Sequence, residues 1–334
     1  MNNFKQGVYC LYSLVKVRHR STLANFVQMR VLAAISILAV TIHGVNTINI
    51  GGFPPEKLNE HNIRNIPAKE FKKLDANALS KIPSSAMGGL KGRQVREISE
   101  EAFKSLTIHQ FCTMSKRALS ALSGEQIRKI RPQVFGESLG VALACVSRLG
   151  ICHVGEEPGK TLSKLSVSGC SGITEEQLAA IHPLSFSFSG EKYIKYISAL
   201  RPEVFRGLTS NQLSRMSREA IGEITEEQVG NIRPEVFEEL GEFALAGLPN
   251  LKVGGITKEQ MARIPPKSFP HLGKEQIKAL KPEAFKGLIG EQFNRMRPRV
   301  RNSLSKEQIK NIRPEVFREL RPDFGGAVLM CLSK

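Results

Sequence analysis

The segment GEEPGKT, at residues 155–161, comes closest in this chain to a motif that could do catalytic chemistry. A phosphate-binding loop needs two glycines separated by four residues and followed by Lys and then Ser or Thr. Here only three residues separate Gly155 from Gly159, and Val154 stands where the first glycine belongs. The sequence that follows predicts no long helix whose N-terminus could bind a phosphate. We therefore interpret 155–161 as a Gly/Pro turn.

The six cysteines and seven histidines have no spacing that is typical of metal ligands or of a nucleophile with its base. The sequence therefore predicts no catalytic residue, no metal and no cofactor, and we expect that the chain is not an enzyme. Cys145, Cys152 and Cys170 are close in sequence, so we expect a disulfide among them if the chain is exported. Their pairing stays open, and the alternative is that they are small buried core residues.

Basic residues form the pattern that points to a ligand. The chain has 48 Lys and Arg against 31 Asp and Glu, a formal net charge of +17, which favours anionic partners. If equivalent positions of a repeat stack, cations at one such position form a regular row that fits a linear polyanion such as a glycosaminoglycan. Six cations stand directly before a proline at the same place in a repeat, and we call them the pre-proline cations: Arg131, Arg201, Arg233, Lys281, Arg297 and Arg313.

These cations also have a purely structural interpretation. Bases late in one helix and acids early in the next complement helix dipoles, and Glu259 and Arg263 have the i,i+4 spacing of a helical ion pair. Nucleic acid is the less favoured polyanion, because phenylalanines such as Phe237 recur in a fixed core register rather than as stacking platforms. We therefore expect an anionic polysaccharide or a protein partner, with self-association as a further alternative.

A repeat of sixteen residues positions these side chains. In LTSNQLSRMSREAIGEITEEQVGNIRPEVFEEL, residues 208–240, apolar residues alternate at steps of five and three. Each sixteen-residue unit contains two octads with apolar residues at their first and sixth positions, for instance Ile224 and Val229, then Ile232 and Phe237. The pattern extends over most of 58–320.

Each octad also carries a start signal for a short helix. The first type, which we call the Gln octad, begins with Ser/Thr-x-x-Gln, the capping-box pattern. The second type, the Pro octad, begins with Arg/Lys-Pro-Glu, which suits the first turn of a helix. Because the next start comes eight residues later, no helix can be long. The predicted capping boxes are Thr107–Gln110, Ser123–Gln126, Thr174–Gln177, Thr209–Gln212, Thr225–Gln228, Thr257–Gln260 and Ser305–Gln308.

Helices of one or two turns are not stable alone and must bury their apolar sides against neighbours. We therefore expect an all-α solenoid of short helices, with two helices per sixteen-residue coil, in one domain over 47–334. Stretches near 139–172 and 245–256 lack the start signals, and we expect them to form locally extended irregular coils. The apolar segment 321–334 is expected to cap the last coil.

The phrase (L/I)TxEQ(L/I/V)xx(L/I)xPExFxxL is similar to the octapeptide-type Leu/Gln/Phe repeats of secreted or surface proteins of microbes, including parasitic ones. The resemblance covers most of the chain. It implies an array with a binding or structural role, and it supplies no catalytic residue.

The N-terminus resembles an export signal. The apolar run 31–42 directly follows Arg30 and has the length of a signal-peptide core rather than of a membrane span. We therefore expect a signal peptide at 29–46 and interpret 1–28 as a mis-called N-terminal extension. The alternative is that 31–42 stays in place as a membrane anchor.

Together these features predict a secreted or cell-surface repeat protein that acts as a binding or scaffold module, with a linear polyanion as its expected partner. One alternative is a self-associating coat, wall or matrix component. Another is a secreted basic effector that binds a host protein or nucleic acid.

Overall fold

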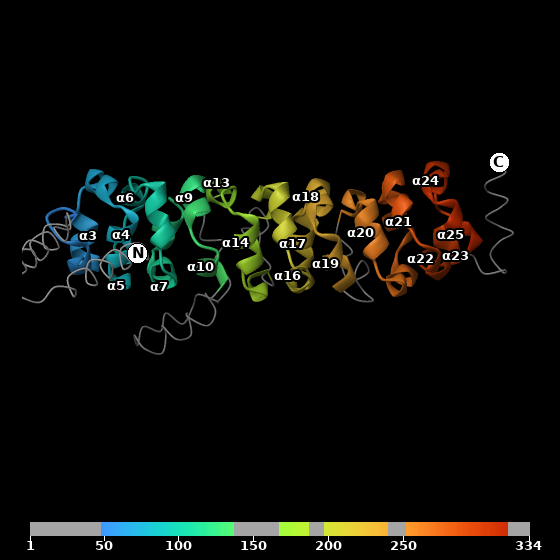
Figure 1. The fold of residues 1–334 in the computed structure, drawn as a ribbon, viewed down its shortest axis with the longest axis horizontal. Coiled ribbons are helices and arrows are strands. Elements are labelled where there is room, and N and C mark those ends of the chain that lie inside the picture. The colour runs from blue at the N-terminus through green and yellow to red at the C-terminus, as the bar shows by residue number, and fades with distance from the viewer. Residues whose placement is uncertain (1–47, 137–166, 187–196, 240–251, 320–334) are drawn as a thin grey trace, which may run out of the picture. The chain divides into compact units, whose positions relative to one another are not determined.

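A computed structural model describes residues 48–136, 167–186, 197–239 and 252–319 (Figure 1). The chain divides into two compact units, Met1–Ile48 and Asn49–Lys334, and the described helices belong to the second. The described residues form helices joined by turns, with one isolated antiparallel bridge between Ile50 and Phe53. The prediction of an all-α fold is confirmed.

Several expectations fall on other parts of the chain. The leader at 29–46, the extension at 1–28, the apolar run 31–42, the turn at 155–161 and the cap at 321–334 all lie outside the described residues. Within the described residues, no helix combines the length and the apolar character that a membrane crossing requires.

The helices are short, and each occupies one octad. The α-helices are α3 (Glu60–Asn65), α4 (Ala76–Lys81), α5 (Ser84–Met87), α6 (Gly92–Val95), α7 (Ile108–Thr113), α8 (Lys116–Leu119), α9 (Gly124–Lys129), α10 (Gln133–Gly136), α13 (Val167–Cys170), α14 (Glu175–Ala180), α16 (Ser210–Arg215), α17 (Arg218–Glu223), α18 (Glu226–Asn231), α19 (Pro234–Glu239), α20 (Lys258–Arg263), α21 (Lys274–Ala279), α22 (Gly290–Arg295), α23 (Pro298–Arg301), α24 (Lys306–Asn311) and α25 (Pro314–Arg318). The 3-10 helices are η1 (Pro55–Lys57), η2 (Ala68–Lys73), η3 (Glu100–Ser105), η4 (Pro183–Phe186), η5 (Pro202–Gly207), η7 (Val253–Gly255), η8 (Pro266–His271) and η9 (Pro282–Gly287).

The start signals work as the sequence predicts. All seven predicted capping boxes form: the Ser or Thr hydroxyl accepts from the Gln main-chain N–H, and the Gln side chain accepts from the N-cap N–H. In the Pro octads, helices such as η5 and η9 begin with Pro at their first position, where the missing N–H leaves no hydrogen bond unmade.

The six-residue helices stop where the next octad begins. At the end of α18, Ile232 adopts an extended backbone with φ −63° and ψ 133°, and its N–H donates to the carbonyl of Val229. Ile232 is buried, as are Val229 and Phe237. The apolar first position of an octad thus ends one helix and enters the core, and the chain turns before the next start signal.

The two irregular stretches were expected to be extended, and this is wrong for their described parts. Val167–Cys170 forms α13, and Val253–Gly255 forms η7. Both segments still follow the eight-residue apolar rhythm, so loss of the start signals changes how the helix begins rather than whether a helix forms. The rest of both stretches lies outside the described residues, except the turn that leads into the next helix.

Packing contacts join helices that are three octads apart. For example, α20 packs against both α19 and η9; it begins at Lys258, whereas α19 begins three octads earlier at Pro234 and η9 three octads later at Pro282. The contacts group the described helices other than α17 into three columns. Column 1 contains α3, α5, α7, α10, α14, η5, α18, η7, α21 and α23; column 2 contains η2, α6 and α8, then η4, α16, α19, α20, η9 and α24; column 3 contains η1, α4, η3, α9 and α13, then η8, α22 and α25.

The expected coil of two octads is therefore wrong. Where no residues are inserted, packing neighbours lie three octads apart, so one coil contains three octads. The period in the sequence, two octads, says which octads are of the same type. The period in the packing, three octads, is the number of octads after which the chain returns to the same column. Since three octads separate neighbours and the two types alternate, a Gln octad packs on Pro octads. The Gln octad of α20, for instance, lies between the Pro octads of α19 and η9.

Buried glutamines tie each Gln octad to the junction between the octads that lie four and three places earlier, insertions aside. The Gln228 amide accepts from Thr225 N–H at 2.9 Å and donates from Nε2 to the carbonyls of Ile197 and Leu200 at 3.1 and 2.7 Å. Those carbonyls lie where one helix ends and the next octad begins, at positions that helix formation leaves unpaired. The same pair of donations is made by Gln94, Gln110, Gln126, Gln177, Gln212, Gln260, Gln292 and Gln308, all buried.

Candidate functional site

The pre-proline cations lie at the starts of Pro-octad helices, as N-caps or directly before them. Arg201, Lys281 and Arg313 are the N-caps of η5, η9 and α25, and each has an extended backbone. Their side chains are exposed, but several also contact the main chain of an earlier octad.

Four of the arginines donate to such main-chain carbonyls. Arg201 donates from Nε to the carbonyl of Ser171 at 3.0 Å. Weaker contacts of 3.4 to 3.5 Å join Arg131 to Leu106, Arg297 to Leu272 and Arg313 to Leu288. Lys281 instead forms an ion pair with Glu226 at 3.1 Å. These contacts favour the structural interpretation of the pre-proline cations, because each ties a cation to a different octad.

The pre-proline cations do not form a single row. Where no residues are inserted, they are separated by two octads or by a multiple of two. Neighbours in a column, however, lie three octads apart. They are consequently divided among the columns: Arg131, Arg201 and Arg297 belong to column 1, Arg233 and Lys281 to column 2, and Arg313 to column 3. The expected row is wrong for this physical reason.

A different set of cations does stack. Lys69, Arg93 and Arg117 are each the fourth residue of an octad, and they recur at every third octad, in η2, α6 and α8. These three helices are successive neighbours in column 2. We call the three residues the stacked basic row. Residues two octads apart in the sequence do not reveal this row, whereas residues three octads apart do.

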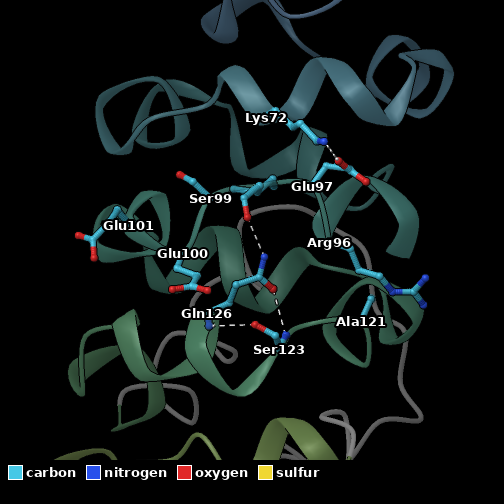
Figure 2. Close-up of a pocket in the computed structure, with 10 residues that line it drawn as sticks. Lys72, Arg96, Glu97, Ser99, Glu100, Glu101, Ala121, Ser123 and Gln126 are labelled. Atoms are coloured by element: carbon cyan, nitrogen blue, oxygen red, sulfur yellow. Dashed lines mark hydrogen bonds and ion pairs between the residues drawn. The ribbon is translucent and has the colours of Figure 1, made fainter.

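A surface hollow in the described residues lies between octads of columns 2 and 3, and Lys72 and Arg96 from the octads of η2 and α6 line it (Figure 2). Most of its polar groups are already paired. Lys72 contacts Glu97 at 3.3 Å, and the Gln126 amide donates to Ile98 and Val95 carbonyls. Arg96 is exposed and forms no ion pair with any described residue. The hollow therefore has little unsatisfied polarity to hold a small ligand, and Arg96 extends the basic surface beside it.

Glu101, also at the rim of this hollow, contacts two lysines. Hydrogen bonds from Lys104 first, and then from Lys129, lower the pKa of Glu101 to about 2. Lys129 belongs to α9 and Glu101 to η3, which are neighbours in column 3. This pair neutralises charge in column 3, in contrast to the stacked basic row.

Charge is unevenly distributed along the described chain. Residues 48–136 carry 15 Lys and Arg against 8 Asp and Glu, a net charge of +7. Residues 197–239 carry 5 against 8, a net charge of −3. Residues 252–319 carry 16 against 7, a net charge of +9. The excess of cations is thus concentrated in the first and last of these segments.

Of the three cysteines expected to form a disulfide, Cys145 and Cys152 lie outside the described residues. Cys170 lies in α13 and is buried, and its burial raises the thiol pKa to about 12. The thiol would therefore be protonated at neutral pH and a poor nucleophile. Among the described residues, no cluster of three or more His, Cys, Asp or Glu side chains has the geometry to hold a metal ion.

Comparisons with protein-family models, curated proteins and solved structures found no match for this chain. The candidate site is therefore argued from its own residues.

Proposed function

We propose that this chain is an exported solenoid of short helices that serves as a binding scaffold for an anionic polysaccharide. The solenoid is supported by the contacts between helices three octads apart, which continue from α3 to α23 in column 1 as a quasi-one-dimensional array. Export is supported by the sequence of 29–46, which resembles a signal peptide.

The observation that carries the proposal is the uneven charge of the described segments. A solvated scaffold needs charged side chains but no excess of one sign over the other in favour of cations, and residues 197–239 carry charges of both signs with a net charge of −3. The values of +7 and +9 on residues 48–136 and 252–319 exceed what solvation requires. Concentrated positive charge raises the local concentration of anionic partners.

The partner class follows from what the surface offers. Single-stranded nucleic acid binds where exposed aromatic side chains stack on bases. Phe53, 40% exposed, is the one large hydrophobic side chain that is exposed among the described residues. Sulfate and carboxylate groups of a polysaccharide need only cations and hydrogen-bond donors, which this surface has.

The test is retention of the full chain on immobilised heparin and on a sulfopropyl cation exchanger of equal charge density. We expect heparin to hold the chain to a distinctly higher salt concentration than the exchanger does, because ordered anions can contact several cations at once. Equal elution from the two resins would contradict the proposal. Self-association into a coat or matrix would then become the leading alternative, and light scattering of the same sample would test it.

A further inference from the structure

The fourth position of the octad has a clear preference in this chain. It lies in the first turn of the helix, where an acidic side chain is favoured by the helix dipole. Glu is the commonest residue there in the described segments, at positions 101, 125, 176, 203, 219, 227, 235, 259, 275, 283, 291, 307 and 315.

The stacked basic row breaks this preference three times in succession. Lys69, Arg93 and Arg117 place a cation where the dipole favours an anion. Duplication of the sixteen-residue unit does not account for them, because three octads are not a whole number of such units. Arg93 accordingly lies in an octad that has the buried glutamine, Gln94, at its fifth position, while the octads of Lys69 and Arg117 have none there. The packing of η2, α6 and α8 is the relation that the three residues share.

Two further cations occupy the fourth position, and they show that such a residue alone does not make a row. Lys267 belongs to η8 in column 3, and Arg299 belongs to α23 in column 1. Neither has a fourth-position cation in the adjacent helices of its column that the structure describes. A local preference that is broken in three stacked helices, without a structural benefit, indicates a functional surface.

The surroundings of the row are also basic. Lys69, Arg93 and Arg117 are exposed and form no ion pair with any described residue. The octads of η2, α6 and α8 together carry eight Lys and Arg against two Glu. Both of those glutamates form ion pairs with other lysines of these octads, Glu70 with Lys73 and Glu97 with Lys72. Arg96 extends the surface on the side of the hollow (Figure 2).

We propose that the stacked basic row is the site at which this chain binds a sulfated polysaccharide. The inference rests on the proposed function and assigns its ligand to column 2 rather than to the pre-proline cations. Helices that pack side by side are about 8–10 Å apart, so the row presents its cations at regular intervals along one direction. A linear polymer with anionic groups on successive sugars can contact all three, whereas a single anion can contact one.

The test compares three forms of the full chain on heparin and on the sulfopropyl exchanger. The row variant carries Lys69→Gln, Arg93→Gln and Arg117→Gln. The control variant carries Lys81→Gln, Lys104→Gln and Arg128→Gln, which remove the same charge from α4, η3 and α9, neighbours in column 3. Circular dichroism during heating checks that both variants keep their helices. A triple change to Glu at the row, the residue that other octads carry there, gives a second variant that the fold should tolerate.

The quantity measured is the heparin margin, the salt concentration of elution from heparin minus that from the exchanger. We expect the row variants to have no heparin margin and the control variant to keep that of the wild type. A margin that survives in the row variants, or is lost equally in the control, would overturn the assignment to the row while leaving the proposed function standing. Absence of a margin in the wild type would overturn both. Wild-type retention on immobilised duplex DNA to higher salt than on heparin would overturn the choice of polysaccharide.

Discussion

At the scale of single residues, the buried glutamines form the most hydrogen bonds to other parts of the chain. Each side-chain amide is buried, and both of its ends form hydrogen bonds to different octads. Oε1 of Gln228 accepts from the N-cap of its own helix, and Nε2 donates to two carbonyls at the end of an earlier one. A buried amide whose bonds are all made specifies one arrangement of its neighbours.

We expect Gln228→Met to destabilise the chain by at least about 3 kcal/mol. Met has a similar volume but cannot donate or accept in the same way, so the Ile197 and Leu200 carbonyls and the Thr225 N–H would lose their partner. Each buried polar group left unpaired costs about 1–3 kcal/mol. The free energy of unfolding from urea titration measures this loss.

Gln133→Met is the matched control, because Gln133 is exposed in α10. An exposed substitution should change the free energy of unfolding by less than about 0.5 kcal/mol. Equal effects of the two substitutions would show that the hydrogen bonds of Gln228 contribute no net stability.

The sequence predicts half of this arrangement. The capping box is local, since Thr225 and Gln228 are three residues apart, and its pattern is visible in any single octad. The donation to Ile197 and Leu200 depends on which octads pack together. No local pattern carries that information, so the second role of glutamine and the stacked basic row both depended on the structure.

At the scale of the helix, neighbours in a column approach each other closely at the eighth position of some octads. A Cβ added to Gly207 would lie 2.0 Å from the carbonyl oxygen of Glu175, and one added to Gly287 would lie 1.8 Å from that of Lys258. Both distances are far below van der Waals contact. Glycine at these positions is therefore explained by main-chain proximity, which the sequence alone does not indicate.

We expect Gly287→Ala to destabilise the chain by about 1–3 kcal/mol, the usual cost of overpacking. The atom that a new Cβ would meet belongs to the main chain of α20, so it cannot move aside as a side chain could. Gly273→Ala provides the control, because there the nearest atom to a new Cβ is the Gln276 side-chain oxygen at 3.6 Å. Thermal melting of both variants gives the comparison, and a melting temperature for Gly287→Ala at or above that of the control would contradict the explanation.

At the scale of the whole described array, two periods coexist. The octad types recur every two octads, and packing neighbours recur every three. The sequence predicts the helices, their starts and the apolar core, because these depend on the octad alone. It does not predict the number of octads between neighbours, since two or three per turn would leave the same apolar pattern.

Deletions of whole octads test how the two periods combine. Removing 272–287 or 256–287, two or four octads, keeps the alternation of types, so each Gln octad still packs on a Pro octad. Removing 264–287, three octads, brings Gln octads against Gln octads. We expect the three-octad deletion to be the least stable, by at least about 3 kcal/mol relative to the two-octad deletion. A later glutamine such as Gln308 donates to the end of a Gln octad in the native chain and would have to donate to the end of a Pro octad instead.

Urea midpoints followed by circular dichroism measure the order of stability. The four-octad deletion is the informative control, because it is shorter than the three-octad deletion and yet should unfold at a higher urea concentration. A steady fall in the midpoint with each octad removed would show that the pairing of octad types does not matter.

The two periods also affect what happens when such a chain gains a repeat. One additional sixteen-residue unit advances every later helix by two octads, and hence from its own column to a different one. A unit gained after α9 would leave the stacked basic row in place and turn the entire downstream surface to another side. Three units, six octads in all, would be needed before the original faces were aligned again. Relatives that differ by a single unit would therefore keep the same fold and present different combinations of faces to a partner.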